Sequence, residues 1–342
     1  MAKVSPSNPP LPDKEREAFV CLKPSGFLLR PPPPPHQLDA FITQDDSLFQ
    51  TIHMGAAEVD LDKYVLIVSG MVETPYSVTL EQLKRLPSKT ISAFHECYGS
   101  PLKPPTTALW RVGNVIWTGV PLCDLLDLAK PNPEAHFVWS EGLDRGDFAG
   151  VEADRYQKDL PMSKAQSPDV LVAYEMNGQP LSKNRGGPVR LVVPGWYGTN
   201  STKWLCKLSC EAERAKGPFT TRWYNEKTQN GGLKPVWEIA INSMIVIPAP
   251  DAVMAGPSVS VQGWSWSSDG IDSVEISADD GKTWKSANVE RRRSCSWQRF
   301  KAEIPLSAGK YKLMAKATSC EGVVQPLAGA RNHAHHVHIQ VQ

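Results

Sequence analysis

The chain has 342 residues, which is long enough for two domains with separate hydrophobic cores. Hydrophobic residues make up 41% of it and charged residues 21%, as in ordinary globular proteins, and the formal net charge at pH 7 is only +1. This balance gives no sign of the basic surplus that nucleic-acid binding requires, and no apolar run approaches the roughly 18 residues of a membrane-spanning helix. We therefore expect neither nucleic acid nor a membrane as a partner.

Residues 1–40 are rich in proline and include five consecutive prolines, Pro31 to Pro35. Such a run favours polyproline II and offers no core to bury, so it predicts a flexible arm, with an SH3-type ligand as the alternative. The first thirty residues lack the apolar core of a signal peptide, and the C-terminal HIQVQ is not an SKL-type peroxisomal signal. With seven scattered cysteines and no CxxC pair, this predicts reduced thiols and a cytoplasmic location.

Residues 41–238 mix short strands, helices and long connections rich in Gly and Pro. Ordered structure is expected to begin near Phe41. Leu61–Gly70 has the apolar composition of a first strand, and Thr79 is a good N-cap for a helix over Thr79–Leu86.

Cys97 lies where an apolar, strand-like run from Ile91 ends and a loop begins with Tyr98, Gly99 and Ser100. The end of a strand is a common place for functional side chains. A free cysteine is also a common small core residue. The local sequence leaves both interpretations open.

A second segment, Val170–Leu205, is expected to hold a helix-like stretch to Met176, a turn at Asn177-Gly178 and a buried strand over Val189–Val193. It ends in a Gly-rich turn and the polar run Thr199–Lys203. Exposed backbone N–H groups beside fixed cations can cradle a phosphate, and a turn with solvated charges is the alternative. The spacing matches neither a Walker nor a Rossmann motif, so ATP and NAD are not indicated.

After Glu238 the pattern changes to short alternating segments separated by turn residues. The expected strands are Ser258–Ser265, Ser273–Ser277, Thr283–Val289 and Lys310–Ala317. Asp279-Asp280-Gly281 suits a tight primed turn, because Asp and Gly tolerate positive φ. Residues 239–342 are therefore predicted to form a β-sandwich.

Together these segments resemble the molybdenum–molybdopterin enzymes of the sulfite oxidase family. The motifs concerned are AYEMNGQPL, GPVRLVVPGWYG and STKWL, then HEC-x-G and GNVIWTGVPL at and after Cys97, and SADDGKTW with Trp264. The resemblance covers residues 41–342. It implies an α+β fold, with a mixed α/β molybdopterin-binding domain over 41–238 followed by an immunoglobulin-like domain over 239–342 that forms a homodimer.

The resemblance also assigns cofactor contacts by position. Cys97 matches the thiolate ligand of molybdenum, which binds beside the dithiolene sulfurs of the pterin, and a soft sulfur ligand suits that role. Tyr224 in RWYN matches the active-site tyrosine, with an ordinary half-buried tyrosine as the alternative. The other matching cofactor-binding positions are Phe49 and His53 of an F-x-x-x-H motif, Asp144 of EGLD, Arg185 (where relatives often have His), Arg190, Ser201, Thr202 and Lys203.

Two positions depart from the sulfite oxidase pattern. Leu102 and Ile52 stand where sulfite oxidases carry arginines that hold the substrate dianion. Losing bidentate guanidinium recognition weakens anion binding unless Lys103, Arg111 or Lys158 substitutes. The sequence therefore still predicts molybdenum chemistry, but it also favours substrates with less charge than sulfite.

By resemblance, the chain is expected to catalyse molybdenum-dependent oxygen-atom transfer, oxidising sulfite or a related small sulfur compound to sulfate. The alternatives are a molybdenum-dependent reductase of an S-oxide, N-oxide or nitrate, and a non-catalytic homodimeric scaffold. No His-Pro-Gly-Gly haem motif is present and no fused flavin domain fits the length, so electrons are expected to pass to O2 or to a separate carrier protein.

The C-terminal segment adds two further candidates. Arg331 could contribute a cation on the substrate side. Alternate histidines on one strand share a face and could bind zinc. The histidines concerned are His333, His335, His336 and His338.

Overall fold

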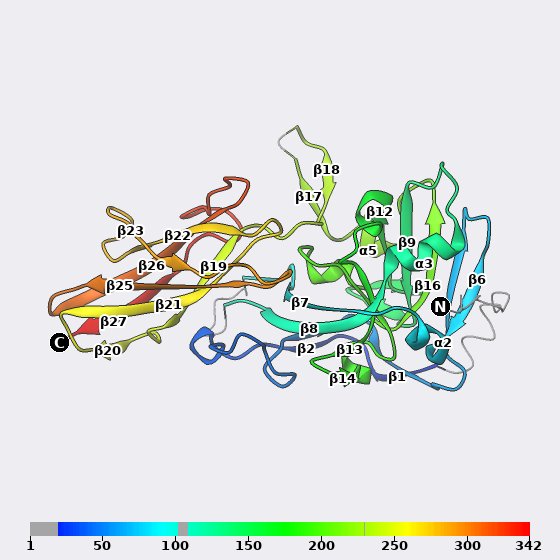
Figure 1. Cartoon of the computed structure of the whole chain (residues 1–342), viewed down its shortest axis with the longest axis horizontal. Helices are drawn as coiled ribbons and strands as arrows, with labels where there is room; N and C mark the ends of the chain where they lie inside the picture. Colours follow the sequence, from blue (N-terminus) through cyan, green and yellow to red (C-terminus); the bar gives the residue numbers. More distant parts are fainter. Residues whose placement is uncertain (1–19, 102–108, 229) are drawn as a thin grey trace. The chain divides into compact units, whose positions relative to one another are not determined.

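The computed structural model describes residues 20–101, 109–228 and 230–342 (Figure 1). They form two compact units that are interleaved in sequence. Unit 1 comprises the chain up to Arg30, Gln50–Ile91 and Ile116–Trp237, and unit 2 comprises Pro31–Phe49, Ser92–Val115 and Glu238–Gln342. The single domain boundary near Glu238 that the sequence suggested is therefore incomplete, because the segment around Cys97 groups with the C-terminal part.

Unit 1 contains a five-stranded sheet. Its strands in chain order are β5 (Val65–Gly70), β6 (Tyr76–Thr79), β9 (Phe137–Gly142), β12 (Gln157–Pro161) and β16 (Leu205–Glu211). They lie in the order β12-β9-β16-β5-β6, and only β16 and β5 are parallel. Gly70 ends β5 with φ +88°, and a Cβ there would lie 2.3 Å from the carbonyl oxygen of Cys210. Glycine is therefore needed where β5 approaches β16.

A second sheet is built around a central strand, β13. Its members are β7 (Lys89–Glu96), β8 (Val112–Pro121), β13 (Leu171–Met176), β14 (Gln179–Pro180) and β15 (Arg190–Val192). The helix-like stretch predicted up to Met176 is wrong, because Leu171–Met176 forms β13. Every residue of this strand except the half-buried Glu175 is buried, so the strand lacks the alternation of apolar and polar residues that identifies strands in a sequence. The turn predicted at Asn177 and Gly178 is confirmed by φ values of 52° and 74°.

Short strand pairs complete unit 1. β1 (Val20–Ser25) pairs with β4 (Gly55–Val59), and β2 (Leu28–Arg30) pairs with β3 (Gln50–Ile52). The other two pairs are β10 (Gly146–Phe148) with β11 (Val151–Ala153), and β17 (Asn225–Lys227) with β18 (Leu233–Pro235). Ordered structure thus begins well before Phe41, and the predicted arm over 1–40 is too long. Residues 1–19 of that arm lie outside the described residues.

The helices of unit 1 are short. They are α2 (Leu80–Arg85), α3 (Leu122–Ala129), α4 (Met162–Ala165) and α5 (Pro218–Thr221), with 3-10 turns η2 (Lys183–Arg185) and η3 (Gly198–Asn200). The predicted N-cap at Thr79 is confirmed, since its hydroxyl accepts a hydrogen bond from the Gln82 N–H and the Gln82 side chain accepts one from the Thr79 N–H. Within the described ranges, no helix is long and apolar enough to cross a membrane.

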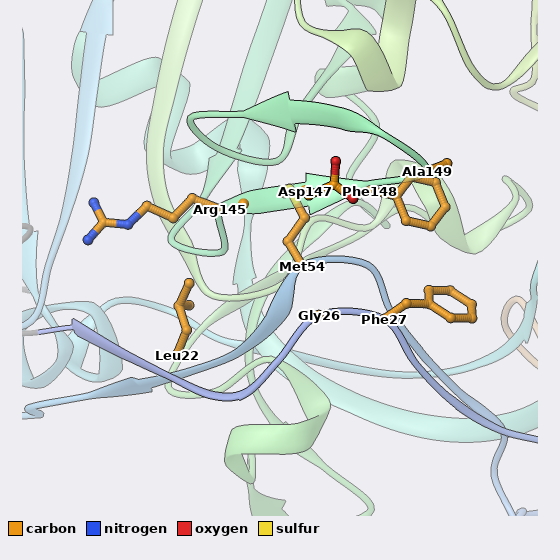
Figure 2. A pocket seen from close by; sticks show the side chains of 9 residues that line it. Leu22, Gly26, Phe27, Met54, Arg145, Asp147, Phe148 and Ala149 are labelled. Atoms are coloured by element: carbon orange, nitrogen blue, oxygen red, sulfur yellow. The ribbon is translucent and has the colours of Figure 1, made fainter.

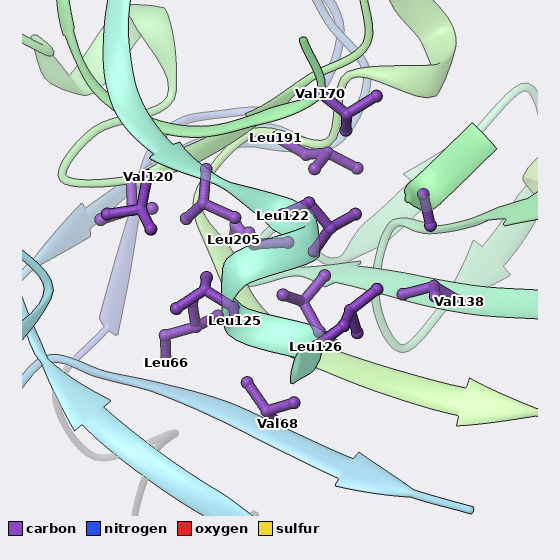
Figure 3. Packing of buried hydrophobic residues seen from close by; sticks show 14 of the residues in the cluster. Leu66, Val68, Val120, Leu122, Leu125, Leu126, Val138, Val170, Leu191 and Leu205 are labelled. Carbon is purple, nitrogen blue, oxygen red and sulfur yellow. The ribbon is translucent and has the colours of Figure 1, made fainter. Parts of the chain in front are cut away.

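The core of unit 1 forms between α3 and the sheet strands (Figure 3). Leu122, Leu125 and Leu126 recur at helical spacing and are buried, so one face of α3 is apolar. Leu66 and Val68 of β5 belong to the same buried cluster. This packing fixes the sheet from which the loops of the candidate site extend.

Unit 2 contains the predicted β-sandwich. One sheet has the order β19-β21-β25-β24 and the other the order β20-β27-β26-β22-β23. The strands are β19 (Asn242–Ile247), β20 (Ala252–Met254), β21 (Ser258–Trp266), β22 (Ile271–Ser277), β23 (Lys285–Ser286), β24 (Asn288–Val289), β25 (Gln298–Pro305), β26 (Gly309–Ser319) and β27 (His336–Val341). A 3-10 turn, η1 (Pro35–Gln37), also belongs to this unit.

The predicted strands of the sandwich are confirmed apart from one. Thr283–Val289 forms two short strands, β23 and β24, which pair with different sheets. Asp280 and Gly281 have φ values of 65° and 81°, so the positive φ expected there is confirmed. The loop is longer than a tight hairpin turn, because Ile276 of β22 pairs with Lys285 of β23. Trp264 and Trp297 stack in parallel with ring centroids 4.7 Å apart, next to the aliphatic core of the sandwich.

We predict that Leu125→Ala destabilises unit 1 by about 2–5 kcal/mol, because it leaves a cavity under a fully buried helix face. Leu61→Ala is the matched control, since Leu61 is 57% exposed and its loss should change the free energy of unfolding by less than about 0.5 kcal/mol. Denaturant unfolding of both variants measures the difference. Equal effects would contradict the packing described for α3.

Candidate functional site

Cys97 follows the last residue of β7 in unit 2 and is half-buried. Its sulfur accepts hydrogen bonds from the backbone N–H of Gly99 at 3.4 Å and from Nη1 of Arg111 at 3.9 Å. A Cβ on Gly99 would lie 2.5 Å from Arg111 Nη1, so glycine lets the guanidinium reach the sulfur. Two N–H donors, one of them cationic, thus face the sulfur that would bind a metal.

The loop that carries Cys97 is held at several points within unit 2. The Cys97 N–H donates to the Arg111 carbonyl at 2.9 Å, and the Ser100 N–H donates to the Cys97 carbonyl at 3.0 Å. Nη1 of Arg331 donates to the carbonyls of Tyr98 at 2.6 Å and Ser100 at 2.5 Å, and its guanidinium carbon lies 3.8 Å from the centroid of the Tyr98 ring. Arg331, predicted as a substrate-side cation, therefore clamps this loop.

In unit 1 the polar loops gather buried cationic side chains. Arg185 and Arg190 are each only 5% exposed. Arg190 donates to the carbonyls of Arg185 at 3.0 Å and Ser201 at 3.2 Å, and its guanidinium stacks 5.0 Å from the centre of the Trp117 ring. Its Nε has no acceptor among the described residues. Burial and the nearby Arg185 lower the pKa of Arg190 to about 9.

Asp144 is the acid beside these cations. Burial raises its pKa to about 7, and the charge of Lys203 opposes that rise. Asp144 Oδ1 has no hydrogen-bond partner among the described residues. A Cβ on Gly142 would lie 2.5 Å from this oxygen, so a side chain there would cover it. Lys203 donates to the carbonyl of Thr51 and lies 5.0 Å from the centre of the Trp204 ring.

The hydroxyls of the predicted anion loop are already used in shaping it. Ser201 Oγ accepts a hydrogen bond from the Val193 N–H at 3.1 Å, and Thr202 Oγ1 is hydrogen-bonded to Ser140 Oγ at 2.7 Å. Both residues are buried. They therefore fix the loop, while the cations beside it provide the charge.

His53 and Tyr224 form a pair in unit 1. His53 Nε2 and the Tyr224 hydroxyl are 2.7 Å apart, and Tyr224 has a positive φ of 59°. The imidazole is enclosed by the rings of Phe148 (centroids 4.7 Å apart) and Phe219 (5.2 Å). Burial, and secondly the charge of Lys203, lower the pKa of His53 to about 3. The neutral imidazole can therefore accept the phenol hydrogen.

An apolar cavity of about 590 Å³ lies against this aromatic group (Figure 2). Its walls include Leu22, Phe27, Met54 and Phe148, with Arg145 and Asp147 at the polar part of its lining. Phe148 thus lines the cavity and also packs against His53. The cavity is a candidate site for an uncharged group.

The structure distributes the predicted residues over both units. Unit 1 holds His53, Asp144, Lys158, Arg185, Arg190, Ser201, Thr202, Lys203 and Tyr224, whereas unit 2 holds Phe49, Cys97 and Arg111. Phe49 stacks on His95 with ring centroids 5.6 Å apart. Ile52 is fully buried. Leu102 and Lys103 lie outside the described residues.

Two residues were not identified from the sequence. Trp117 lies under the Arg190 guanidinium, and Tyr156 donates to the Thr199 carbonyl at 2.7 Å and packs on His53 at 5.5 Å. Both are buried aromatics in strand-like segments, so the sequence shows them only as core residues. The zinc site considered for the C-terminal histidines has no support, since the described residues contain no group of three or more potential ligands.

Comparison with known proteins identifies the family to which the chain is similar. Residues 53–219 match the family model "Oxidoreductase molybdopterin binding domain", and residues 233–339 match "Mo-co oxidoreductase dimerisation domain". Mitochondrial sulfite oxidase of Mus musculus is 32% identical over 91% of this chain and 63% of its own length. Sulfite oxidase of Arabidopsis thaliana is 28% identical over 94% of this chain and 89% of its own.

A solved structure extends the comparison. Sulfane dehydrogenase SoxCD from Paracoccus pantotrophus superimposes with a TM-score of 0.81 at 27% identity, covering 99% of this chain and 92% of that one. The predicted α+β fold is thereby confirmed. The chain spans about 63% of the length of the mouse relative, so that protein contains a part with no counterpart here.

The residues present fit a phosphate-bearing pterin cofactor with a metal. In unit 1, the buried Arg190 guanidinium has no carboxylate partner among the described residues and its Nε has no acceptor, a deficit that a phosphate would fill. The unpartnered Asp144 oxygen suits the N–H groups of a pterin ring. In unit 2, the donor-facing sulfur of Cys97 suits a soft metal ligand.

We predict opposite effects of Arg190→Met on stability and on cofactor retention. The cofactor-free variant should be at least as stable as the cofactor-free wild type, because a buried unpaired cation costs desolvation energy. Cofactor affinity should fall by about 10- to 100-fold through the loss of charge-assisted hydrogen bonds. Thermal unfolding and pterin fluorescence measure the two effects.

Arg85→Met is the matched control, because Arg85 lies on the exposed side of α2. It should leave both quantities unchanged. An Arg190→Met protein that unfolds readily but retains its pterin would show that Arg190 is a structural residue.

Proposed function

The chain belongs to the sulfite-oxidase-like molybdopterin oxidoreductases, and from this we propose that it catalyses molybdenum-dependent oxygen-atom transfer to a small sulfur compound such as sulfite. The observation that carries the proposal is the Cys97 sulfur, which receives hydrogen bonds from Gly99 and Arg111 and is not packed as a core thiol. When bound, the molybdenum cofactor supplies two-electron redox chemistry at the metal. The chain supplies ligation, orientation and charge.

Each group has a task that follows from its contacts. Arg190 and Lys203 offer positive charge to the cofactor phosphate, and Asp144 accepts hydrogen bonds from the pterin ring. Cys97 holds the metal through its thiolate. In the His53 tautomer that accepts at Nε2, the Tyr224 hydroxyl donates to His53, and its phenolic oxygen can then accept a hydrogen bond from a protonated substrate oxygen.

The names of the relatives support a sulfur substrate. The mouse and Arabidopsis relatives are sulfite oxidases, and the structural neighbour is a sulfane dehydrogenase. The match to a dimerisation domain supports a homodimer formed through residues 233–339. Electrons would pass from the molybdenum centre to O2 or to a separate carrier protein, and we expect a cytoplasmic location.

A second candidate function is reduction of an S-oxide, N-oxide or nitrate by the same cofactor. Ile52 favours it, because a fully buried aliphatic side chain occupies a position where sulfite oxidases carry a substrate arginine. The apolar cavity beside Phe148 could take the organic part of such a substrate. A non-catalytic scaffold would require the buried cations of unit 1 to serve no ligand, which their desolvation disfavours.

We predict that Cys97→Ser lowers turnover by more than about 100-fold, because a hydroxyl is a much weaker ligand than a thiolate for a soft metal site. Sulfite-dependent reduction of ferricyanide or of cytochrome c measures turnover. Cys320→Ser, at an exposed thiol, should retain full activity. Full activity of Cys97→Ser would overturn the assignment of the metal ligand.

We also predict that purified protein contains about one molybdenum and one pterin per chain, as expected for a site built into the fold. Elemental analysis and pterin fluorescence measure the content. Molybdenum far below one equivalent in protein produced by cells that make the cofactor would favour the scaffold. On loaded enzyme, sulfite oxidation supports the first function, and reduction of neutral S- or N-oxides without sulfite oxidation supports the second.

A further inference from the structure

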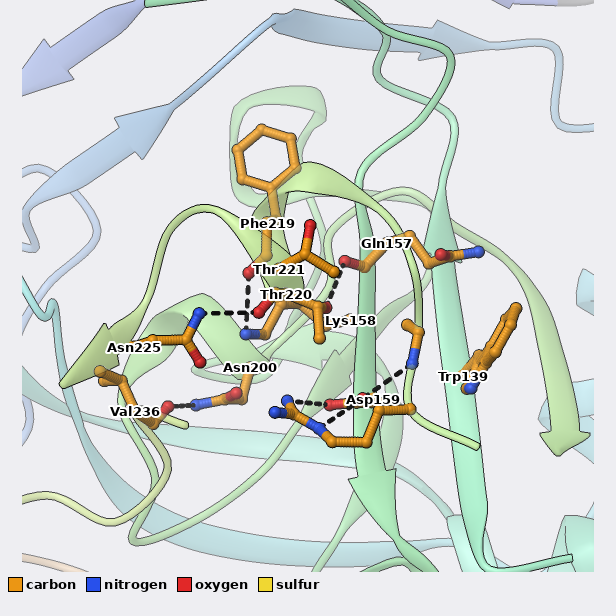
Figure 4. Close-up of polar contacts among 12 residues, drawn as sticks. Trp139, Gln157, Lys158, Asp159, Asn200, Phe219, Thr220, Thr221, Asn225 and Val236 are labelled. Carbon is orange, nitrogen blue, oxygen red and sulfur yellow. Dashed lines mark hydrogen bonds and ion pairs between the residues drawn. The ribbon is translucent and has the colours of Figure 1, made fainter. Parts of the chain in front are cut away.

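Lys158 is a buried cation for which the cofactor contacts give no role. It lies on β12, its residue is only 1% exposed, and its ammonium donates to the carbonyl of Phe219 at 3.1 Å (Figure 4). An ammonium has three N–H donors, and this is its one hydrogen bond among the described residues. No carboxylate among the described residues forms an ion pair with this ammonium. Its hydrogen-bonding capacity is therefore largely unused.

The neighbouring acid, Asp159, forms its hydrogen bonds with other groups. Asp159 accepts hydrogen bonds from Arg214 at 2.9 and 3.0 Å and from the Ala215 N–H at 2.9 Å. Successive side chains of a strand point to opposite faces, so Asp159 and Lys158 project away from each other. Asp159 attracts the ammonium only from a distance. Desolvation outweighs that attraction and lowers the pKa of Lys158 to about 8.

The ammonium lies beside the candidate catalytic tyrosine. Lys158 Nζ is 5.6 Å from the centre of the Tyr224 ring, and the Tyr224 hydroxyl is bonded to His53. Lys158 also holds α5 through the Phe219 carbonyl, and Asn225 donates to the carbonyls of Thr220 and Trp223 in the same turn. The turn that carries Tyr224 is thus assembled against a buried positive charge.

A buried cation without an acid costs free energy that an apolar side chain of the same length would avoid. Such a group beside a candidate catalytic side chain is a candidate for ligand binding. We propose that Lys158 supplies the positive charge with which this site binds a singly charged, anionic substrate beside Tyr224. The inference rests on the proposed oxidation of a small sulfur compound and specifies the charge of that compound.

The charge follows from the side chains present. Ile52 is aliphatic and buried where a substrate arginine is expected, so it offers no compensation for a second negative charge. The Lys158 ammonium by itself balances one negative charge. A monoanion with a lone pair on sulfur, of the hydrogen sulfite or sulfinate type, fits this balance better than a dianion. A neutral S-oxide gains no ion pair from Lys158.

The charge on Lys158 also predicts a pH dependence. The charged and titratable groups around it are Asp159 and Arg214, which pair with each other, the phenol of Tyr224, and His53, whose pKa is lowered to about 3. An anion needs the ammonium form. Anion binding should therefore be complete below pH 7 and weaken as the pH rises through about 8.

The test compares Lys158→Met with Lys164→Met in the holoenzyme. Lys164 is a matched control, because its ammonium also donates to a carbonyl (Pro194, 3.0 Å) and also lies over an aromatic ring (Trp196, 5.4 Å). The probes are methanesulfonate, a non-reacting monoanion, and dimethyl sulfone, its neutral counterpart of similar shape. Isothermal titration calorimetry measures both dissociation constants.

We expect Lys158→Met to weaken methanesulfonate binding by at least about tenfold while dimethyl sulfone binding stays unchanged. Lys164→Met should bind both probes as the wild type does, and Lys158→Arg should recover methanesulfonate binding. The proposal is overturned if Lys158→Met keeps wild-type affinity for the anion, if both probes are lost equally in a folded variant, or if the wild type binds no methanesulfonate.

The pH dependence of the wild type keeps the proposal testable if Lys158→Met does not fold. Methanesulfonate affinity that stays constant between pH 7 and pH 9 would overturn it. Failure of the proposed function can be distinguished from failure of this inference, because calorimetry measures binding without turnover. Wild type that binds the anion but oxidises no sulfur compound would refute the function alone, whereas sulfite oxidation unaffected by Lys158→Met would refute the inference alone.

Discussion

The chemistry of unit 1 depends on the concentration of buried positive charge in its polar loops. Arg185 ends η2 and Arg190 begins β15, and both are buried, whereas Lys203 is half-buried in the loop before β16. Asp144 is the acid near Lys203. Desolvation lowers the pKa of Arg190 and raises that of Asp144, so each charged form is disfavoured until a ligand compensates it. A fold that keeps such groups buried gains little stability from them. The arrangement is explained by a polyanionic cofactor that it is built to hold.

In unit 2, the position of the Cys97 loop is fixed by hydrogen bonds to its backbone. Arg331 holds two carbonyls of the loop, and Arg111 reaches the sulfur because Gly99 has no side chain. A metal ligand must be held in one geometry, and a loop fixed through its own carbonyls satisfies this need. The sandwich is therefore more than a surface for association, since it contributes the arginine that fixes this loop.

We propose that substrate binding depends on the small number of charged side chains near Tyr224. Ile52 is buried and aliphatic, the imidazole of His53 is neutral at physiological pH, and Lys158 is the cation next to Tyr224. In a desolvated site each missing or extra charge changes binding strongly. Membership of the family supports the cofactor and the class of reaction. We propose that the number of charges in this particular site selects one sulfur compound over another.

The sequence by itself determined the family and the sandwich, because short motifs with fixed chemistry carry that information, and it predicted the cofactor positions by resemblance. It predicted Thr79 as an N-cap and the turns at Asn177 and Asp280, since capping and positive φ are local properties. It failed at Leu171–Met176, where a strand buried on both faces has no alternation, and at β1 and β2, whose partners lie 20 to 40 residues away in the chain. Only the tertiary structure showed that Arg190 has no acid partner, that Arg331 clamps the Cys97 loop and that Lys158 lies beside Tyr224, because charge balance and burial depend on which distant segments pack together.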